Sequence, residues 1–137
     1  MNAFPPINDA HPDYSDQPGT RFVTVIPFSF SPPLTANQRL HWANRADKTK
    51  TLRTLTAYHA RRFPELGKCR VTLTWYVKTK HRRDADNIVP TLKAMCDGLV
   101  DAGVVTDDTP DLMVKDMPVI TYDPYGAPRM ELRIEKL

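Results

Sequence analysis

The chain has 137 residues, of which 41% are hydrophobic, and its formal net charge at pH 7 is +3. This length allows one hydrophobic core and argues against two separate domains. No apolar run approaches the length of a membrane span, and the first ten residues contain neither the basic nor the apolar region of a secretion signal. We therefore expect a soluble, single-domain protein that stays in the cytoplasm.

Charge is distributed unevenly along the chain. Residues 39–83 contain thirteen Lys or Arg and two acidic residues, a local net charge of +11. Residues 84–111 contain seven Asp and one Lys, a local net charge of −6. A basic surface beside a compact acidic cluster is typical of a protein that holds a polyanion and gathers divalent cations.

The N-terminal segment, residues 1–20, is rich in Pro, Asp, Asn and Ser and shows no hydrophobic periodicity. Such a segment buries too little apolar area to offset its ordering entropy, so we expect a disordered tail. The β-branched run Arg21 to Pro27 predicts a first strand, which opens a domain covering residues 21–137.

A polar loop is expected after this strand. Its amides and guanidinium groups suit hydrogen bonds to phosphate, and its indole suits stacking on a base. The candidate DNA-binding residues of this loop are Asn37, Arg39, Trp42 and Arg45. The alternative for Trp42 is a place in the core, and the alternative for His41 is an ordinary surface position.

Residues 47–63 predict a basic helix that ends at Pro64 and Gly67. Its cations Lys48 and Lys50 are further candidates for DNA contact. A basic helix is also a common form of solvated surface, so the charge alone does not decide between the two interpretations.

The strictly alternating run Cys69 to Lys78 is the clearest strand in the sequence, with Trp75 at an inward position. A basic segment follows it directly and ends where the acidic cluster begins. We expect its cations to hold phosphates beside a reactive bond, the alternative being a flexible charged loop. These cations are Lys78, Lys80, Arg82 and Arg83.

An amphipathic helix is predicted from about Ile88 to Ala102. Its apolar stripe consists of Ile88, Leu92, Met95, Cys96 and Leu99. Its polar face carries Lys93, Asp97 and Asp101. Asp86 or Asn87 is placed to cap the start, and Pro90 occupies the first turn. Gly103 is placed to end the helix with left-handed backbone.

Two acidic pairs flank this helix, Asp84 with Asp86 before it and Asp107 with Asp108 after it. The helix is about 22 Å long, so both pairs share a site only if the segment after Gly103 folds back. Carboxylates without Cys or His suit Mg²⁺, or alternatively Mn²⁺, rather than Zn²⁺. Two such ions about 3.5 to 4 Å apart are a common device for phosphodiester hydrolysis.

Each acidic motif also has a purely structural interpretation. Asp-x-Asp-Asn before a helix often serves as a cap, and Asp-Asp-Thr-Pro often opens a loop. The two motifs, however, flank one helix and follow a basic segment. Clustered carboxylates repel one another unless a cation compensates them, so the combination favours a metal site.

The C-terminal region adds two β segments. Leu112 to Tyr122 is interrupted by Pro118, which predicts an edge strand or a bulge, and Arg129 to Leu137 alternates again. The order β-α-β-α-β-β predicts an α+β fold, a two-layer sandwich with a mixed sheet and both helices on one face.

The sequence D-A-D-N, a helical lysine and D-G-L-V-D-A-G-V-V-T-D-D together resemble the signature of the RusA family of phage and prophage Holliday-junction resolvases. The match is specific over this stretch and extends more weakly over residues 21–137. The resemblance implies a homodimeric, Mg²⁺-dependent endonuclease that nicks four-way DNA junctions symmetrically. The expected alternative is a non-catalytic module that binds branched or single-stranded DNA.

The resemblance also implies roles for individual residues. Asp84, Asp86 and Asp108 would be the essential carboxylates, and these three together with Asp107 would be the metal ligands. Asp107 would be their neighbour, and Lys93 would be the supporting base or phosphate contact. The segment from Asp86 to Lys93 is three residues longer here than in the best-known member of the family, whereas the spacing from Lys93 to Asp108 matches without a gap.

Overall fold

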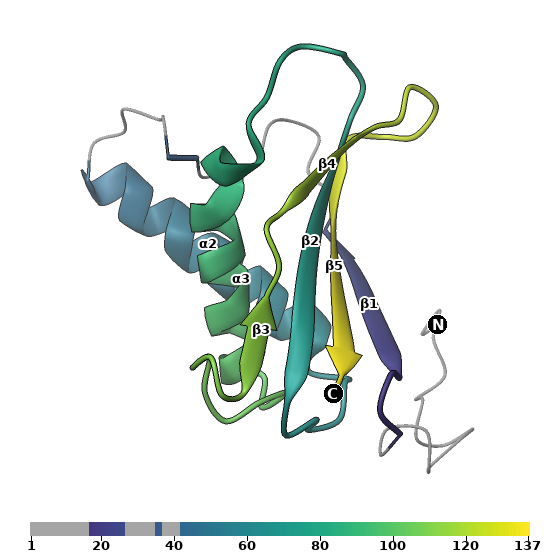
Figure 1. Ribbon diagram of the computed structural model, residues 1–137. Helices are drawn as coiled ribbons and strands as arrows, with labels where there is room; N and C mark the ends of the chain where they lie inside the picture. The colour runs from purple at the N-terminus through teal and green to yellow at the C-terminus, as the bar shows by residue number, and fades with distance from the viewer. Residues whose placement is uncertain (1–16, 27–34, 37–41) are drawn as a thin grey trace, which may run out of the picture.

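The computed structural model describes residues 17–26, 35–36 and 42–137 and shows the predicted α+β fold (Figure 1). One mixed sheet and two α-helices account for most of this part of the chain. In chain order the elements are β1 (Arg21–Ile26), α2 (Trp42–Ala60), β2 (Cys69–Val77), the short 3₁₀ helix η2 (Ala85–Ile88), α3 (Val89–Asp101), β3 (Met113–Lys115), β4 (Val119–Tyr122) and β5 (Arg129–Lys136).

The segment predicted as a disordered tail lies mostly outside the described residues. Its last part, residues 17–20, forms a turn that is bonded to the end of β5. The N–H of Gly19 donates to the carbonyl oxygen of Lys136 at 2.7 Å, and the N–H of Lys136 donates to that of Thr20 at 2.8 Å. The chain is therefore attached to the sheet before β1 begins.

The strands follow the order β1-β5-β2-β3, and β4 also pairs with β2. β5 is antiparallel to β1 and β2, whereas β3 and β4 run parallel to β2. The predicted single run Leu112 to Tyr122 is thus two strands, separated by residues 116–118. Among the described strands both pair with β2 alone, which agrees with the predicted edge position.

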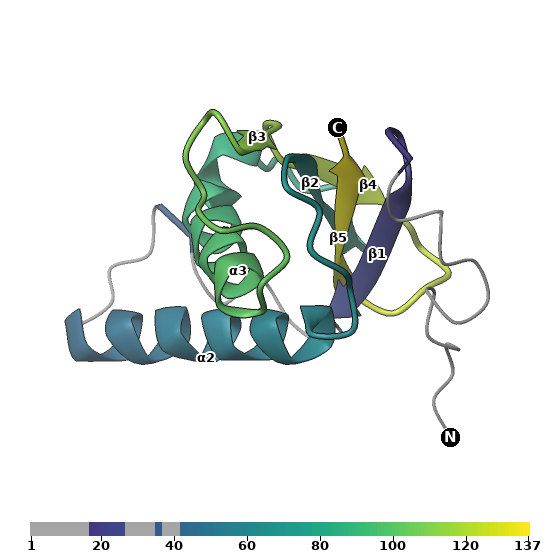
Figure 2. The same ribbon diagram turned by 90° about the horizontal axis from the view of Figure 1, so that it is seen from below.

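Alternation along the strands separates a buried sheet face from an open one. In β2 every second side chain is buried, from Cys69 to Val77, and Trp75 is among them as predicted. In β5 the buried side chains are Met130, Leu132 and Ile134. Figure 2 shows α2 and α3 on the same side of the sheet, where they cover this buried face.

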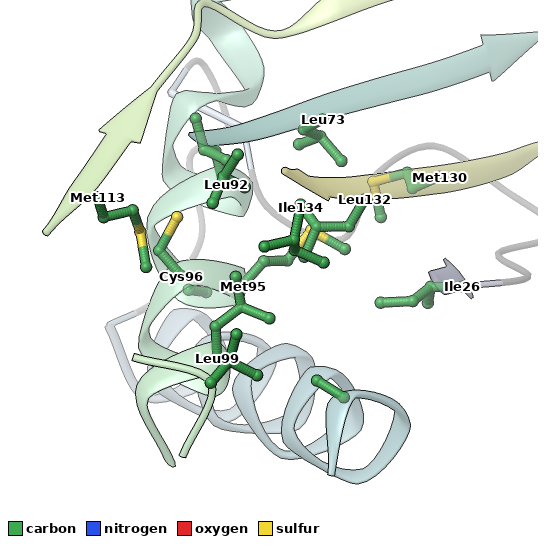
Figure 3. Packing of buried hydrophobic residues seen from close by; sticks show 14 of the residues in the cluster. Ile26, Leu73, Leu92, Met95, Cys96, Leu99, Met113, Met130, Leu132 and Ile134 are labelled. Atoms are coloured by element: carbon green, nitrogen blue, oxygen red, sulfur yellow. The ribbon is translucent and has the colours of Figure 1, made fainter. Parts of the chain in front are cut away.

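The hydrophobic core lies between the sheet and α3 (Figure 3). Every residue of the predicted apolar stripe is buried, so that prediction is confirmed: Ile88, Leu92, Met95, Cys96 and Leu99. Full burial of a side chain such as Leu99 contributes roughly 1.5 to 3 kcal/mol relative to exposure. The stripe therefore fixes how α3 is rotated and which of its residues face outward.

The basic helix begins earlier than the sequence predicted. α2 starts at Trp42 and ends at Ala60, whereas the expected bounds were residues 47 and 63. Trp42 and Arg45 consequently lie on the helix rather than on a loop. The early start left no signal in the hydrophobic pattern, because the buried side chains of α2 begin only at Leu52.

α3 lies within one residue of its predicted bounds at each end. Pro90 is in its first turn and Gly103 has a φ of 82°, both as predicted. The capping prediction is wrong, because Asp86 and Asn87 belong to η2 and no side chain caps the start of α3. A 3₁₀ turn instead leads into the helix, and the N–H of Asn87 donates to the carbonyl oxygen of Asp84 at 3.0 Å.

Candidate functional site

The chain folds back after α3, as the sequence analysis required. The N–H of Val104 donates to the carbonyl oxygen of Leu99 at 3.1 Å, and the carbonyl oxygen of Val104 accepts from the N–H of Leu66 at 2.7 Å. Val104 and Val105 are buried. These contacts turn the following residues back along α3, so that Asp108 reaches a residue only one turn into the helix, Lys93.

Lys93 and Asp108 form the centre of the site. The Lys93 ammonium donates to Oδ2 of Asp108 at 2.7 Å and to Oδ1 of Asp97 at 2.9 Å. Lys115 on β3 donates to the same Oδ2 of Asp108 at 3.2 Å. Two predicted catalytic residues that are fifteen positions apart in the sequence are thus in direct contact.

The hydrogen bonds of this cluster favour the charged forms of Lys93 and Asp108. Hydrogen bonds from Lys93 and Lys115 lower the pKa of the Asp108 carboxyl to about 2. The bonds to Asp108 and Asp97 raise the pKa of the Lys93 ammonium above its ordinary value. Asp108 is therefore an ionised acceptor, and Lys93 is a cation rather than a free base in this arrangement.

Asp107 shapes the turn that presents its neighbour. Its Oδ1 accepts the backbone N–H of Asp108 at 2.8 Å, and its side chain is exposed. One carboxylate oxygen of Asp107 thereby orders the backbone of the acidic pair. This contact gives Asp107, which was predicted as a metal ligand, a structural role in the turn.

Asp84 and Asp86 lie at the other end of the acidic unit, before α3. Asp84 precedes η2, and its side chain is 60% exposed with Arg82 Nε at 3.8 Å from Oδ1. Asp86 lies within η2 and is exposed. Across the described residues, no three Asp, Glu, His or Cys side chains come close enough together to hold a metal ion. The two acidic pairs thus flank one helix without forming such a group of three.

The donor chemistry of the four carboxylates nevertheless fits a hard divalent cation. They offer only oxygen ligands, and they are reachable from solvent because all but Asp108 are exposed. In Asp108 both lysines contact Oδ2, and among the described residues Oδ1 accepts no hydrogen bond. The predicted Mg²⁺ ligands Asp84, Asp86, Asp107 and Asp108 thus have suitable donor atoms, but the structure does not bring three of them together at one point.

The loop that carries two of the candidate DNA-binding residues is attached to this site. The N–H of Ala36 donates to the carbonyl oxygen of Asn87 at 2.8 Å, and Arg45 Nη1 donates to the carbonyl oxygen of Thr35 at 3.2 Å. Asn37 and Arg39 themselves lie outside the described residues, as does His41. The chain immediately before them nevertheless contacts η2, next to Asp86.

The basic segment after β2 is held by contacts with its surroundings. Lys78 Nζ donates to the carbonyl oxygen of Gly126 at 3.1 Å, and Lys80 Nζ lies 4.8 Å from the centre of the Tyr122 ring. Arg83 Nη2 donates to Oγ1 of Thr79 at 2.7 Å. These contacts weaken the alternative of a loop without structure, and they leave the cations on the surface ahead of Asp84.

The basic face of α2 surrounds a shallow hollow of about 690 Å³. Arg45, Thr49, Lys50 and Arg53 line it from α2, and Asp101 lines it from the end of α3. Lys48 is half-buried and Lys50 is exposed. Arg53 is neutralised by Asp101, so the net positive charge of this surface comes from the first half of the helix.

Trp42 is 76% exposed at the start of α2. The alternative that placed this indole in the core is therefore wrong. The side chain therefore lies at the surface, at the first residue of α2.

Lys115 belongs to the site and was missed by the sequence analysis. Motif comparison drew attention to the acidic pairs and to the helical lysine, and Lys115 lies outside these motifs. A signal was present, because Met113 and Lys115 alternate on one face of β3 and Met113 is buried. A lysine two positions from a buried methionine lies on the same face of its strand, so its side chain starts beside the core and extends from there to the surface.

Comparison with known proteins does not assign the chain to a family: no family model matches it, and no curated protein matches it. In the part of the chain that the structure describes, none of the helices is both long and apolar enough to cross a membrane.

Proposed function

We propose that the protein is a divalent-metal-dependent endonuclease that resolves four-way DNA junctions by paired, symmetric nicks. The observation that carries the proposal is the contact between Lys93 and Asp108, which joins the helical lysine to the second acidic pair at 2.7 Å. A structural loop opener would not need an acidic residue folded back onto the first turns of the preceding helix. The resemblance of the acidic unit to the RusA family supports the same activity.

The proposed roles follow from the chemistry of each side chain. Asp84, Asp86 and Asp108 hold Mg²⁺, or alternatively Mn²⁺, through carboxylate oxygens. The metal, when bound, supplies Lewis-acid activation of the attacked phosphodiester and of water. Lys93 stabilises negative charge on the phosphate as its bond to Asp108 is exchanged for one to the substrate.

DNA binding is proposed for two groups of mostly basic residues that precede the acidic unit in the sequence. Lys78, Lys80, Arg82 and Arg83 precede Asp84 directly, and the second group lies around the start of α2. This second group comprises Asn37, Arg39, Trp42, Arg45, Lys48 and Lys50. Phosphate contacts of this kind position a duplex without reading its sequence, which suits recognition of junction shape. We expect a homodimer, because two symmetric nicks require two sites related by a two-fold axis.

The proposal is tested by incubating the purified protein with a labelled four-way junction and with the matching linear duplex. Reactions with Mg²⁺, Mn²⁺ and EDTA are compared for the parent protein and for Asp86→Asn. Asp111→Asn is the matched control, because Asp111 is an exposed aspartate outside the proposed ligand set. We expect paired nicks in the junction alone, dependent on metal, lost in Asp86→Asn and retained in Asp111→Asn.

Other outcomes distinguish the rival functions. Tight, salt-sensitive binding of the junction without cleavage in either metal would identify a DNA-binding module and overturn the enzyme assignment. Cleavage that persists unchanged in Asp86→Asn would overturn the residue assignment while leaving nuclease activity in place.

A further inference from the structure

Two lysines from different elements contact one oxygen atom of Asp108. Lys93 comes from α3 and Lys115 from β3, and both donate to Oδ2, at 2.7 Å and 3.2 Å. Lys93 has a second partner in Asp97, whereas Asp108 is the one ion-pair partner of Lys115 among the described residues. The Lys93 ammonium therefore divides its hydrogen bonds between Asp108 and Asp97, whereas that of Lys115 bonds to Asp108 alone among the described residues.

The backbone that carries Lys115 is held within the sheet by its pairing with β2. Lys115 pairs with Val71 in the parallel ladder between β2 and β3. The next residue, Asp116, donates its N–H to the carbonyl oxygen of Val71 at 3.0 Å and accepts the Thr72 hydroxyl at 3.0 Å. The backbone on both sides of the Lys115 side chain is thus fixed to β2.

Lys93, by contrast, projects from the outer surface of a helix. Its side chain is 57% exposed, compared with 30% for Lys115. Rotation of this long side chain about its own bonds would carry the ammonium away from Asp108 without moving α3. Lys93 is therefore the lysine that can leave Asp108 for another partner, and Lys115 is the one that keeps its contact with Asp108.

A hollow beside the cluster gives a ligand access to both lysines. Its volume is about 380 Å³, and its lining includes Val89, Leu92, Lys93, Lys115 and Met117. Met117 is 60% exposed, so the hollow is open to solvent on the side that Met117 lines. Lys93 lines this hollow and Asp108 does not, so a phosphate bound in it would lie beside the Lys93 ammonium.

We propose that Lys115 is a positioning residue of the nuclease site. It holds Oδ2 of Asp108 while Lys93 turns to the substrate phosphate, and it keeps the other oxygen of Asp108 directed to its ligand. Without Lys115, departure of Lys93 would leave the Asp108 carboxylate without a cation and free to rotate. This inference rests on the proposed function and adds a residue that the acidic motifs do not contain.

The first test compares Lys115→Met, Lys115→Arg and the control Lys68→Met, which removes an exposed lysine just before β2. Loss of an outer contact to a metal ligand typically costs about 10- to 100-fold in activity, so we expect that decrease in the single-turnover cleavage rate of Lys115→Met. Junction affinity, measured in the Asp86→Asn background, should stay within about twofold, because Lys115 acts through Asp108 rather than on DNA. Lys115→Arg should recover most of the rate.

The second test needs no cleavage. Melting temperatures are measured for Lys115→Met, Asp108→Asn and the double variant, without metal. Because the two side chains interact directly, we expect Lys115→Met to lower the melting temperature of the parent protein and to leave that of Asp108→Asn nearly unchanged. Additive shifts would overturn the contact, and Lys115→Arg keeps this test informative if Lys115→Met does not fold.

The outcomes separate this inference from the function on which it rests. A parent protein that binds but does not cut junctions would overturn the nuclease function itself. In a cutting protein, a rate unaffected by Lys115→Met, or lowered equally by Lys68→Met, would overturn the role of Lys115 alone.

Discussion

Arg53 on α2 and Asp101 at the end of α3 form a two-point ion pair, with Nε 2.5 Å from Oδ2 and Nη2 2.8 Å from Oδ1. The two helices approach each other closely at Gly98, three residues before Asp101. A Cβ atom at Gly98 would lie 2.6 Å from the carbonyl oxygen of Arg53 and 2.8 Å from Cβ of Thr56. The helix crossing therefore requires glycine at this position, and the crossing sets where α3 presents Lys93.

The substitution Gly98→Ala should destabilise the protein. In an exposed helix the same change is stabilising by about 1 kcal/mol, because glycine is a poor helix former. Here the added methyl group meets backbone that cannot move without shifting α2, and overpacking of this kind costs about 1 to 3 kcal/mol. Chemical denaturation monitored by circular dichroism measures the difference, and an unchanged or higher midpoint would contradict the crossing geometry.

The variant Arg53→Met provides the comparison for that experiment. It removes the surface ion pair and leaves the close contact at Gly98 intact. Since both partners of the pair are exposed, the denaturation midpoint of Arg53→Met should fall less than that of Gly98→Ala. A larger loss in Arg53→Met than in Gly98→Ala would show that the ion pair, rather than the close packing, holds the helices together.

Stability at acid pH should depend on Asp108. Its pKa is about 2 in the folded protein, below the value of about 4 expected for an unfolded aspartate. A depressed pKa contributes stability that is fully present above about pH 4 and is lost as the pH falls toward 2. Between these values the melting temperature of Asp108→Asn should fall less steeply than that of the parent protein. Parallel curves would contradict the lowered pKa.

Replacing the helical lysine should affect catalysis more than binding. In Lys93→Met the ammonium proposed to stabilise the phosphate is lost, and removal of one such group typically lowers the rate about 10²- to 10³-fold. Asp97→Asn removes only a side contact of Lys93 and should cost far less. Single-turnover cleavage of a four-way junction measures both, and equal losses in the two variants would argue that Lys93 acts only within the ion-pair cluster.

The sequence predicted the elements whose burial follows a regular period. The stripe from Ile88 to Leu99 and the alternation of β2 were correct because one side of each element packs on the core. The start of α2 was missed because its first half buries no side chain, so no period marks it. The break between β3 and β4 was only partly foreseen, because both strands are short and pair with different parts of β2.

The candidate site was predictable to a similar extent. The turn of the chain after Gly103 was predicted from helix length as the condition for one shared acidic site, whereas the contact of Asp108 with Lys93 was found only in the structure. Lys115 was not found, because its partnership with Asp108 depends on the parallel register of β3 against β2. Lys115 lies only seven positions after Asp108, but the path of the chain between them follows from that strand pairing rather than from a repeating pattern.

Arg82 and Arg83 are neighbours with different surroundings. The side chain of Arg82 is 90% exposed, and its closest ionic contact is Asp84 at 3.8 Å. Arg83 donates to the carbonyl oxygen of Thr79 at 2.9 Å, and its guanidinium lies 5.3 Å from the centre of the Trp75 ring. Arg82 is thus available to a phosphate, whereas Arg83 already holds the loop together.

This difference predicts separate effects on DNA binding, measured in the inactive Asp86→Asn background at several salt concentrations. Loss of one phosphate contact lowers the slope of log affinity against log salt by about 1, and we expect this change in Arg82→Ala. Arg83→Ala should change the slope less and should instead speed amide hydrogen exchange in residues 79–83, because it releases the contacts to Thr79. A slope unaffected by Arg82→Ala, or lowered equally by both variants, would show that exposure in this segment does not select the DNA-contacting cation.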